Sequence, residues 1–351
     1  MDKPLVSVFI KSYNRMYYLE RCLFSVKKYL IDTNYSITVI DDGTPEVYLN
    51  ALKTKYPEIQ IQKTEFYNQK TSYCSQGLSP KEKHIPINSW VDATKNASEY
   101  FLWLEDDIWL TSPISLQPII AHLKTHNTLF LKFFWLGNPD IIQAKEETPV
   151  ASNILALTPK LPVWHPFLYK LIFYKFDRFK IRKTFKFLNI HTRKKDLSFY
   201  SLYSVAGNIF QKEYFTSLWE NHTNNVDEKL QIYNALRFLK NKGLKNEKNL
   251  FFRSQTEWMR TGFCSSASQP KKNRGKMHSN WMFQLNYNLN ELWLHGKFNS
   301  IENFPFDFSE KYFEQKLIES KTPYPIIDLW KKWRIHFIKE FEGIGCRKIV
   351  P

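Results

Sequence analysis

Residues 101–107 of this chain read Phe-Leu-Trp-Leu-Glu-Asp-Asp. The four consecutive apolar residues predict a strand that is buried on both faces, as strands of parallel sheets are. The strand ends in three carboxylates, Glu105, Asp106 and Asp107. Acidic side chains crowded at the end of a buried strand repel one another, so they commonly hold a cation or a hydroxyl-rich ligand. The alternative is a solvated acidic turn before the next helix.

The composition is that of a globular protein with excess positive charge. Of 351 residues 43% are hydrophobic, and 50 Lys and Arg against 34 Asp and Glu give a formal net charge of +16. This balance favours an anionic partner such as nucleotide phosphates, an acidic membrane face or nucleic acid. The four cysteines are widely spaced, which argues against a zinc site or a disulfide framework and favours a reducing cytoplasm. Neither a signal peptide nor a membrane span is expected.

The first 136 residues alternate between strand and helix patterns. Strands are expected at 5–10, 36–40, 59–61, 101–104 and 129–136, helices at 19–30, after Pro45, after Pro86 and at 116–123, and a polar loop at 68–83. This alternation predicts an α/β fold with a Rossmann-like, doubly wound, mostly parallel sheet. The sequence lacks the glycine signatures of dinucleotide-binding dehydrogenases and of P-loop enzymes, which argues against both classes.

Polar residues follow three of the expected strands. The segments are Lys11-Ser12-Tyr13-Asn14-Arg15, Asp41-Asp42-Gly43 and Glu105-Asp106-Asp107. In a parallel sheet ligands bind beyond the carboxyl ends of the strands, so we expect these segments to line one crevice.

In this order and at these separations, the three segments resemble the family 2-like glycosyltransferases of GT-A fold, over roughly residues 4–135. The resemblance implies that Tyr13 lies against the nucleobase of a nucleotide-diphosphate sugar, that Asp42 accepts a hydrogen bond from the base and that Asp106 meets the ribose. Asp107 would bind the metal that bridges the diphosphate. Lys11, Ser12 and Arg15 join the predicted donor-binding residues, and Glu105 joins the predicted metal ligands.

The predicted chemistry is consistent with these residue types. A departing diphosphate develops negative charge, and Mg²⁺ or Mn²⁺, which would neutralise it, prefers carboxylate oxygens. The alternatives are that Tyr13 only covers the adjacent helix and that Asp42 only caps a turn. Many members of the family carry a small-residue, Asn-containing stretch before the acidic motif, whereas residues 68–83 here contain Lys70, Lys81 and Lys83, which either meet phosphate or are solvated.

A basic, aromatic segment spans residues 166–195. Cations interleaved with aromatic rings suit an anionic membrane face, a phosphorylated lipid carrier or single-stranded nucleic acid. The alternative is an insertion whose rings pack on the core while its lysines stay solvated. No specific nucleic-acid motif accompanies the segment.

Two later segments suggest the acceptor side of a site. Asp227 and Glu228 open a helix, and in the resembling family an Asp or Glu at this place takes the proton from the attacking hydroxyl. We expect Asp227 to be this base, with Glu228 as the alternate; the other interpretation is the ordinary preference of acids for a helix N-terminus. The predicted mobile loop 265–278 offers further candidates, if it is not simply solvated: Lys271, Lys272 and Arg274 for the diphosphate and His278 for the metal.

The resulting hypothesis is a metal-dependent glycosyltransferase that moves a sugar from a nucleotide-diphosphate donor to a glycan or lipid-linked acceptor, with inversion, in cell-surface polysaccharide synthesis. It would be cytoplasmic or peripheral on the inner face of the cell membrane. We expect residues 1–136 to bind the donor, 137–300 to form an acceptor-side half, and 301–351 to be a helical extension with an amphipathic final helix docked on its own domain. The alternatives are a retaining transferase and a non-enzymatic basic module that binds nucleic acid or membrane.

Overall fold

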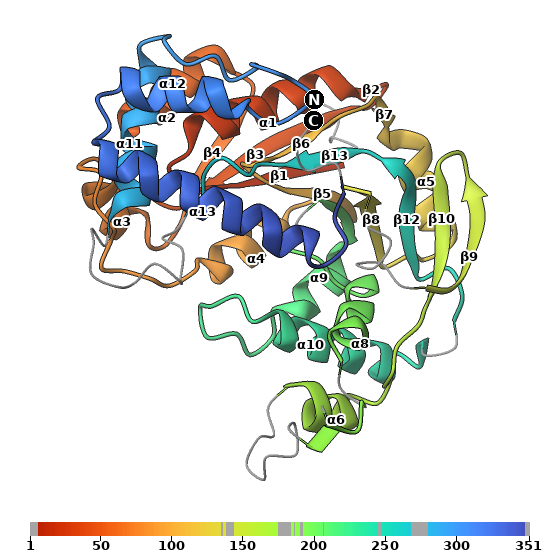
Figure 1. Cartoon of the computed structure of the whole chain (residues 1–351). Helices are drawn as coiled ribbons and strands as arrows, with labels where there is room; N and C mark the ends of the chain where they lie inside the picture. The colour runs from red at the N-terminus through yellow and green to blue at the C-terminus, as the bar shows by residue number, and fades with distance from the viewer. Residues whose placement is uncertain are drawn as a thin grey trace.

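A computed structural model describes residues 6–134, 136–137, 144–174, 184–185, 187–189, 192–205, 207–244, 247–267 and 280–347. In this part of the chain, nine strands form one sheet in the order β4-β3-β1-β5-β11-β8-β12-β10-β9 (Figure 1). The strands are β1 (Val6–Ser12), β3 (Tyr35–Asp41), β4 (Gln60–Lys63), β5 (Tyr100–Glu105), β8 (Phe130–Phe134), β9 (Ala144–Ala151), β10 (Ile154–Pro159), β11 (Asn208–Gln211) and β12 (Phe251–Glu257). Two small sheets pair β2 (Leu30–Ile31) with β7 (Ile114–Ser115), and β6 (Ile108–Leu110) with β13 (Met259–Thr261).

The α/β class predicted from the sequence is confirmed, and the sheet as a whole is mixed. Strands β4, β3, β1 and β5 pair in parallel, so their carboxyl ends meet at one edge. Strand β11 then runs antiparallel to both β5 and β8, β12 is parallel to β8, and β10 and β9 are antiparallel additions. One continuous sheet therefore runs through the expected donor-binding and acceptor-side halves.

Helices pack around the sheet in the described part of the chain. They are α1 (Met16–Tyr29), α2 (Glu46–Lys55), α3 (Tyr67–Cys74), α4 (Ile87–Lys95), α5 (Leu116–Thr125), α6 (Pro166–Tyr169), α8 (Arg193–Leu197), α9 (Lys212–Leu218), α10 (Glu228–Asn241), α11 (Trp281–Leu294), α12 (Glu310–Glu319) and α13 (Tyr324–Glu342). Helix α6 lies below α10 at the lower end of the molecule in Figure 1.

Helix α3 corrects one expectation, because it lies in the stretch predicted to be a polar loop. Its buried residues are Tyr67, Lys70 and Cys74. A lysine at the middle buried position hides the apolar periodicity by which a helix is recognised. The buried Lys70 forms an ion pair within the candidate site.

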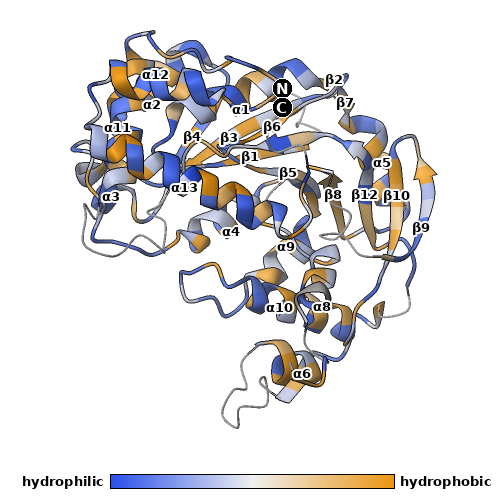
Figure 2. Cartoon of the chain, in the orientation of Figure 1, coloured by the Kyte–Doolittle hydropathy of each residue, from blue (hydrophilic) through white to orange (hydrophobic). Residues whose placement is uncertain are grey.

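The last helix packs on its own domain, as predicted. In α13 the indole Nε1 of Trp330 donates to the carbonyl of Cys264 at 2.8 Å, and the rings of Phe337 and Phe341 lie 5.5 and 5.1 Å from that of Phe263. Apolar and hydrophilic residues alternate along this helix in Figure 2, as an amphipathic helix requires. None of the helices in the described part of the chain combines the length and low polarity needed to cross a bilayer.

Candidate active site

The three polar segments that follow β1, β3 and β5 come together at one edge of the sheet. The backbone N–H of Asp42 donates to the carbonyl of Ser12 at 3.1 Å, and the N–H of Asp106 donates to that of Lys11 at 2.9 Å. The segments after β3 and β5 are thereby fixed to the end of β1. This is the position at which parallel α/β sheets bind ligands.

Asp42 lies at the end of β3 in an almost fully buried position. Its carboxylate accepts from the Thr64 hydroxyl at 2.6 Å and pairs with the Lys70 ammonium at 2.5 Å. Burial raises the pKa of Asp42 to about 6, and the ammonium of Lys70 opposes this effect. Gly43 permits the close approach of α3, because a Cβ on it would lie 2.6 Å from the Cβ of Lys70, and its φ of +133° also favours glycine.

Tyr13 forms a half-buried aromatic wall beside this ion pair. The Lys70 ammonium lies 5.4 Å from the centre of the Tyr13 ring. The ring also packs edge to face against that of Phe283 in α11, with 6.1 Å between the ring centres. The Cys74 thiol donates a weak hydrogen bond to the Tyr13 hydroxyl at 3.8 Å. Tyr13 and Asp42 therefore both lie next to one cation, Lys70, at this edge of the sheet.

Arg15 binds both aspartates of the acidic motif. Its guanidinium contacts Asp106 twice, at 2.5 Å from Nη2 to Oδ1 and 3.3 Å from Nε to Oδ2, and donates from Nη1 to Asp107 Oδ2 at 2.8 Å. Asp106 also accepts from the backbone N–H of Tyr13 at 3.3 Å. Burial raises the pKa of both carboxyl groups, and the guanidinium opposes the rise. The side chain of Asp107 is 18% exposed and that of Asp106 only 3%, so Asp107 is the more accessible of the two.

Glu105 has a different partner. Its carboxylate pairs at 2.5 Å with Lys11, whose ammonium lies 4.6 Å from the centre of the Trp90 ring. In the described ranges no three His, Cys, Asp or Glu side chains are arranged to hold a metal ion. Magnesium commonly uses only one or two protein carboxylates and completes its shell with waters and substrate phosphates. Asp107, as the more accessible carboxylate of the Asp106 and Asp107 pair, is the residue here that could serve as such a ligand.

The predicted acceptor residues Asp227 and Glu228 have different environments. Asp227 is the N-cap of α10, and its Oδ1 accepts from the backbone N–H groups of Lys229 and Leu230 at 3.2 and 3.3 Å. Glu228 instead accepts a hydrogen bond from the hydroxyl of Tyr200. Sequence reasoning missed Tyr200, because a tyrosine in a short 3₁₀ helix, here Ser198–Ser201, leaves no distinctive pattern. Lys271, Lys272, Arg274 and His278 lie outside the described residues.

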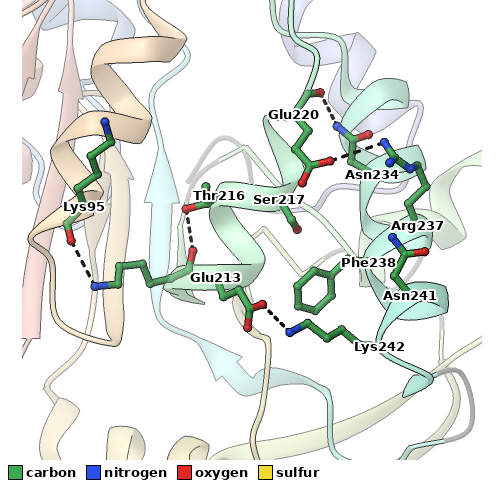
Figure 3. A pocket seen from close by; sticks show the side chains of 11 residues that line it. Lys95, Glu213, Thr216, Ser217, Glu220, Asn234, Arg237, Phe238, Asn241 and Lys242 are labelled. Carbon is green, nitrogen blue, oxygen red and sulfur yellow. Dashed lines mark hydrogen bonds and ion pairs between the residues drawn. The ribbon is translucent and has the colours of Figure 1, made fainter.

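A pocket of about 580 Å³ lies elsewhere, between α9 and α10 (Figure 3). It contains none of the predicted site residues. Two of its cations are neutralised inside the pocket, Lys242 by Glu213 at 2.6 Å and Arg237 by Glu220 at 3.6 Å (Figure 3). These ion pairs do not distinguish the pocket from the strand ends, where Lys11, Arg15 and Lys70 are also paired with carboxylates.

No protein-family model and no curated protein matches the sequence. Among solved structures, S. aureus TarS 1-349 in complex with UDP-GlcNAc is similar at a TM-score of 0.40 and 13% identity, over 90% of this chain and 71% of that one. Glucosyl-3-phosphoglycerate synthase from Mycobacterium tuberculosis, in complex with Mn²⁺, UDP-glucose and glycerol 3-phosphate, is similar at 0.37 and 12%, over 87% and 88%. Both similarities are distant, and they concern the fold only.

Proposed function

We propose that this chain is a glycosyltransferase that moves a sugar from a nucleoside-diphosphate sugar to an acceptor hydroxyl with the help of a divalent cation. The observation that carries the proposal is the meeting of three groups at the ends of β1, β3 and β5. These are the half-buried ring of Tyr13, the buried carboxylate of Asp42 and the acidic pair held by Arg15. A flat ring beside an acceptor oxygen suits a nucleobase, and the acidic pair suits ribose hydroxyls and a metal-bound diphosphate.

Each group has a distinct role in donor binding. The base lies against Tyr13 and donates an N–H to Asp42, whose carboxylate is oriented by Thr64 and Lys70. Asp106 accepts from ribose hydroxyls. Asp107 would hold the metal, which when bound supplies positive charge to the departing diphosphate. Arg15 keeps both aspartates in place and limits their mutual repulsion.

For the acceptor side we propose Glu228 as the general base, and Asp227 as the alternate. This reverses the order expected from the sequence. The carboxylate of Asp227 is engaged by two backbone N–H groups at the start of α10, which is a capping role. Glu228 is oriented by a single side-chain donor, Tyr200, and keeps capacity to accept the proton of an attacking hydroxyl in an inverting transfer.

The acceptor is proposed to be membrane-linked, with the basic, aromatic segment as the contact. Most of its cations, including Lys180, Arg182, Lys183 and Lys186, lie outside the described residues. The described part exposes apolar side chains, with Phe167 and Phe187 64% and 86% exposed and Leu168 and Leu188 also exposed. Exposed apolar side chains next to a run of basic residues suit an anionic lipid surface.

Thermal denaturation with a panel of nucleoside diphosphates, with and without Mn²⁺, tests the proposed donor site. We expect at least one nucleotide to raise the Tm of the parent, because a ligand that binds only the folded state stabilises it. Tyr13→Ala should lose most of this shift, whereas Tyr324→Ala, which removes a tyrosine that is exposed on α13, should keep it. A panel without any effect on the parent, or a full shift in Tyr13→Ala, would contradict the proposal.

A further inference from the structure

A row of buried polar side chains crosses three neighbouring strands on one face of the sheet. Trp103 of β5 lies opposite Asn208 of β11, which in turn lies opposite Lys132 of β8. Directly opposed residues of antiparallel strands point to the same face. The indole Nε1 of Trp103 and the Oδ1 of Asn208 are buried without a hydrogen-bond partner, and so is the hydroxyl of Tyr203. Buried polar groups are rarely left in this state unless a ligand or water completes them.

Lys132 is the most unusual member of this row. Its side chain is 1% exposed, and no carboxylate of the described residues lies within ion-pair distance of its ammonium. The ring of Tyr200 faces it, with its centre 5.7 Å from Nζ, and the charges of Glu228 and of the Cys346 thiol also act on the ammonium. Burial lowers the pKa of Lys132 to about 7, and Glu228 opposes this effect. An apolar side chain of similar size could pack equally well at this position, so packing alone does not require a lysine.

The row lies between the two halves of the proposed site. Trp103 and Glu105 are two residues apart on β5, so they point to the same face, where Glu105 pairs with Lys11. At the other end, Tyr200 links the surroundings of Lys132 to Glu228. Tyr203 lies between them: burial raises the pKa of its phenol, and the charges of both Glu228 and Glu105 contribute to the rise. The buried polar groups therefore lie between Glu105, at the end of β5, and Glu228, the proposed base.

We propose that Lys132, Tyr203, Asn208 and Trp103 form an acceptor subsite, and that the acceptor carries an anionic group, a phosphate or a carboxylate, close to its reacting hydroxyl. This inference rests on the proposed function. The ammonium of Lys132, the hydroxyl of Tyr203 and the indole N–H of Trp103 can all donate to anionic oxygens. The Oδ1 of Asn208 accepts from a hydroxyl of the same molecule. A neutral sugar acceptor would provide no negative charge to pair with the ammonium of Lys132.

The test is thermal denaturation of the full chain with saturating nucleoside diphosphate and Mn²⁺, to which glycerol, glycerate or glycerol 3-phosphate is added. These probes have the same carbon skeleton and differ in their anionic group. We expect glycerate or glycerol 3-phosphate, and not glycerol, to raise the Tm of the parent further, and the stronger of the two identifies the anion. Lys132→Met should lose this added shift. The control Lys95→Met, which removes an exposed cation paired with Asp92 on α4, should keep it.

The same variant separates binding from packing. Without ligand, Lys132→Met should be at least as stable as the parent, because it removes a buried charge that forms no ion pair with any described residue. A lower Tm in the unliganded variant, or an equal response of variant and parent to the anionic probes, would overturn the subsite. If the parent responds to nucleotide but to neither anionic probe, this inference fails and the proposed function stands. If the parent does not respond to nucleotide, the proposed function itself fails.

Discussion

The guanidinium of Arg15 donates to the carboxylate of Asp107 at 2.8 Å, at the edge of the sheet where we expect a metal ion to bind. A divalent cation that approaches Asp107 must share this carboxylate with Arg15 or displace it. The described residues provide no further cluster of metal-binding side chains to compensate for that competition. The affinity for metal should therefore depend strongly on the diphosphate that supplies additional oxygen ligands.

We accordingly expect metal and nucleotide to bind cooperatively. Mn²⁺ alone should change the Tm of the parent little, whereas Mn²⁺ with the preferred nucleoside diphosphate should raise it more than the nucleotide does alone. Asp107→Asn preserves shape and removes the charge, so the metal-dependent part of the shift should disappear in a folded protein. Asp92→Asn, at an exposed carboxylate on α4, is the matched control. An unchanged metal-dependent shift in Asp107→Asn would exclude Asp107 as the ligand.

Nucleotide affinity should depend on pH through Asp42. Its pKa is raised to about 6 by burial, so the carboxylate is protonated below that pH and no longer accepts freely from the base. We expect Kd, measured by calorimetry, to be nearly constant above pH 7 and to rise about tenfold per pH unit well below 6. Asp42→Asn should bind weakly at all pH values without this dependence. A parent whose affinity is flat down to about pH 4 would show that ionised Asp42 does not contact the base.

The general base can be assigned by comparing two isosteric variants. Glu228→Gln should reduce transfer to acceptor about 100-fold or more while donor affinity stays within a few-fold of the parent. Asp227→Asn should retain transfer and stability, because asparagine is also a good N-cap. Asp227→Ala should instead lose about 1 kcal/mol of stability through loss of the cap. The opposite pattern, with transfer lost in Asp227→Asn and kept in Glu228→Gln, would restore Asp227 as the base.

Membrane contact should depend on the exposed apolar residues of α6. We expect Phe167→Ser with Leu168→Ser to lower co-sedimentation with anionic vesicles, since less apolar surface can enter the interface. Hydrolysis of the free donor should be unaffected. Ile335→Ser, at an exposed apolar residue of α13, is the control. Equal vesicle binding by the double variant and the parent would favour the interpretation that this segment only packs on the core.

The parallel half of the fold was predictable because its signals are local. The apolar run at 101–104 lies within β5, and the helical spacing from Leu19 onward corresponds to α1. Pro86 indicated the start of α4 correctly, and Asp227 with Glu228 indicated the start of α10. Strand pairing in the second half was not predictable, because antiparallel insertion of β11 between β5 and β8 depends on contacts far apart in the sequence.

The residues of the candidate site were predictable from the sequence, but the ion pairs between them were not. The sequence placed Tyr13, Asp42, Asp106 and Asp107 near one another, but it did not indicate that Arg15 would bind both aspartates or that Lys70 would bind Asp42. Such ion pairs form between elements distant in the chain and leave no periodic signal. Lys132 did leave one, because it interrupts an otherwise apolar strand. A charged residue inside a buried strand is the pattern that would have indicated it.

The central claim is tested most directly by incubating the protein with a panel of nucleoside-diphosphate sugars and measuring release of the nucleoside diphosphate, with Mn²⁺ and with EDTA. The account predicts slow, metal-dependent release from at least one donor by the parent, strong acceleration by a suitable acceptor, and no release by Asp107→Asn. Absence of release from every donor, with and without a suitable acceptor, would contradict it, and so would release that neither EDTA nor Asp107→Asn reduces.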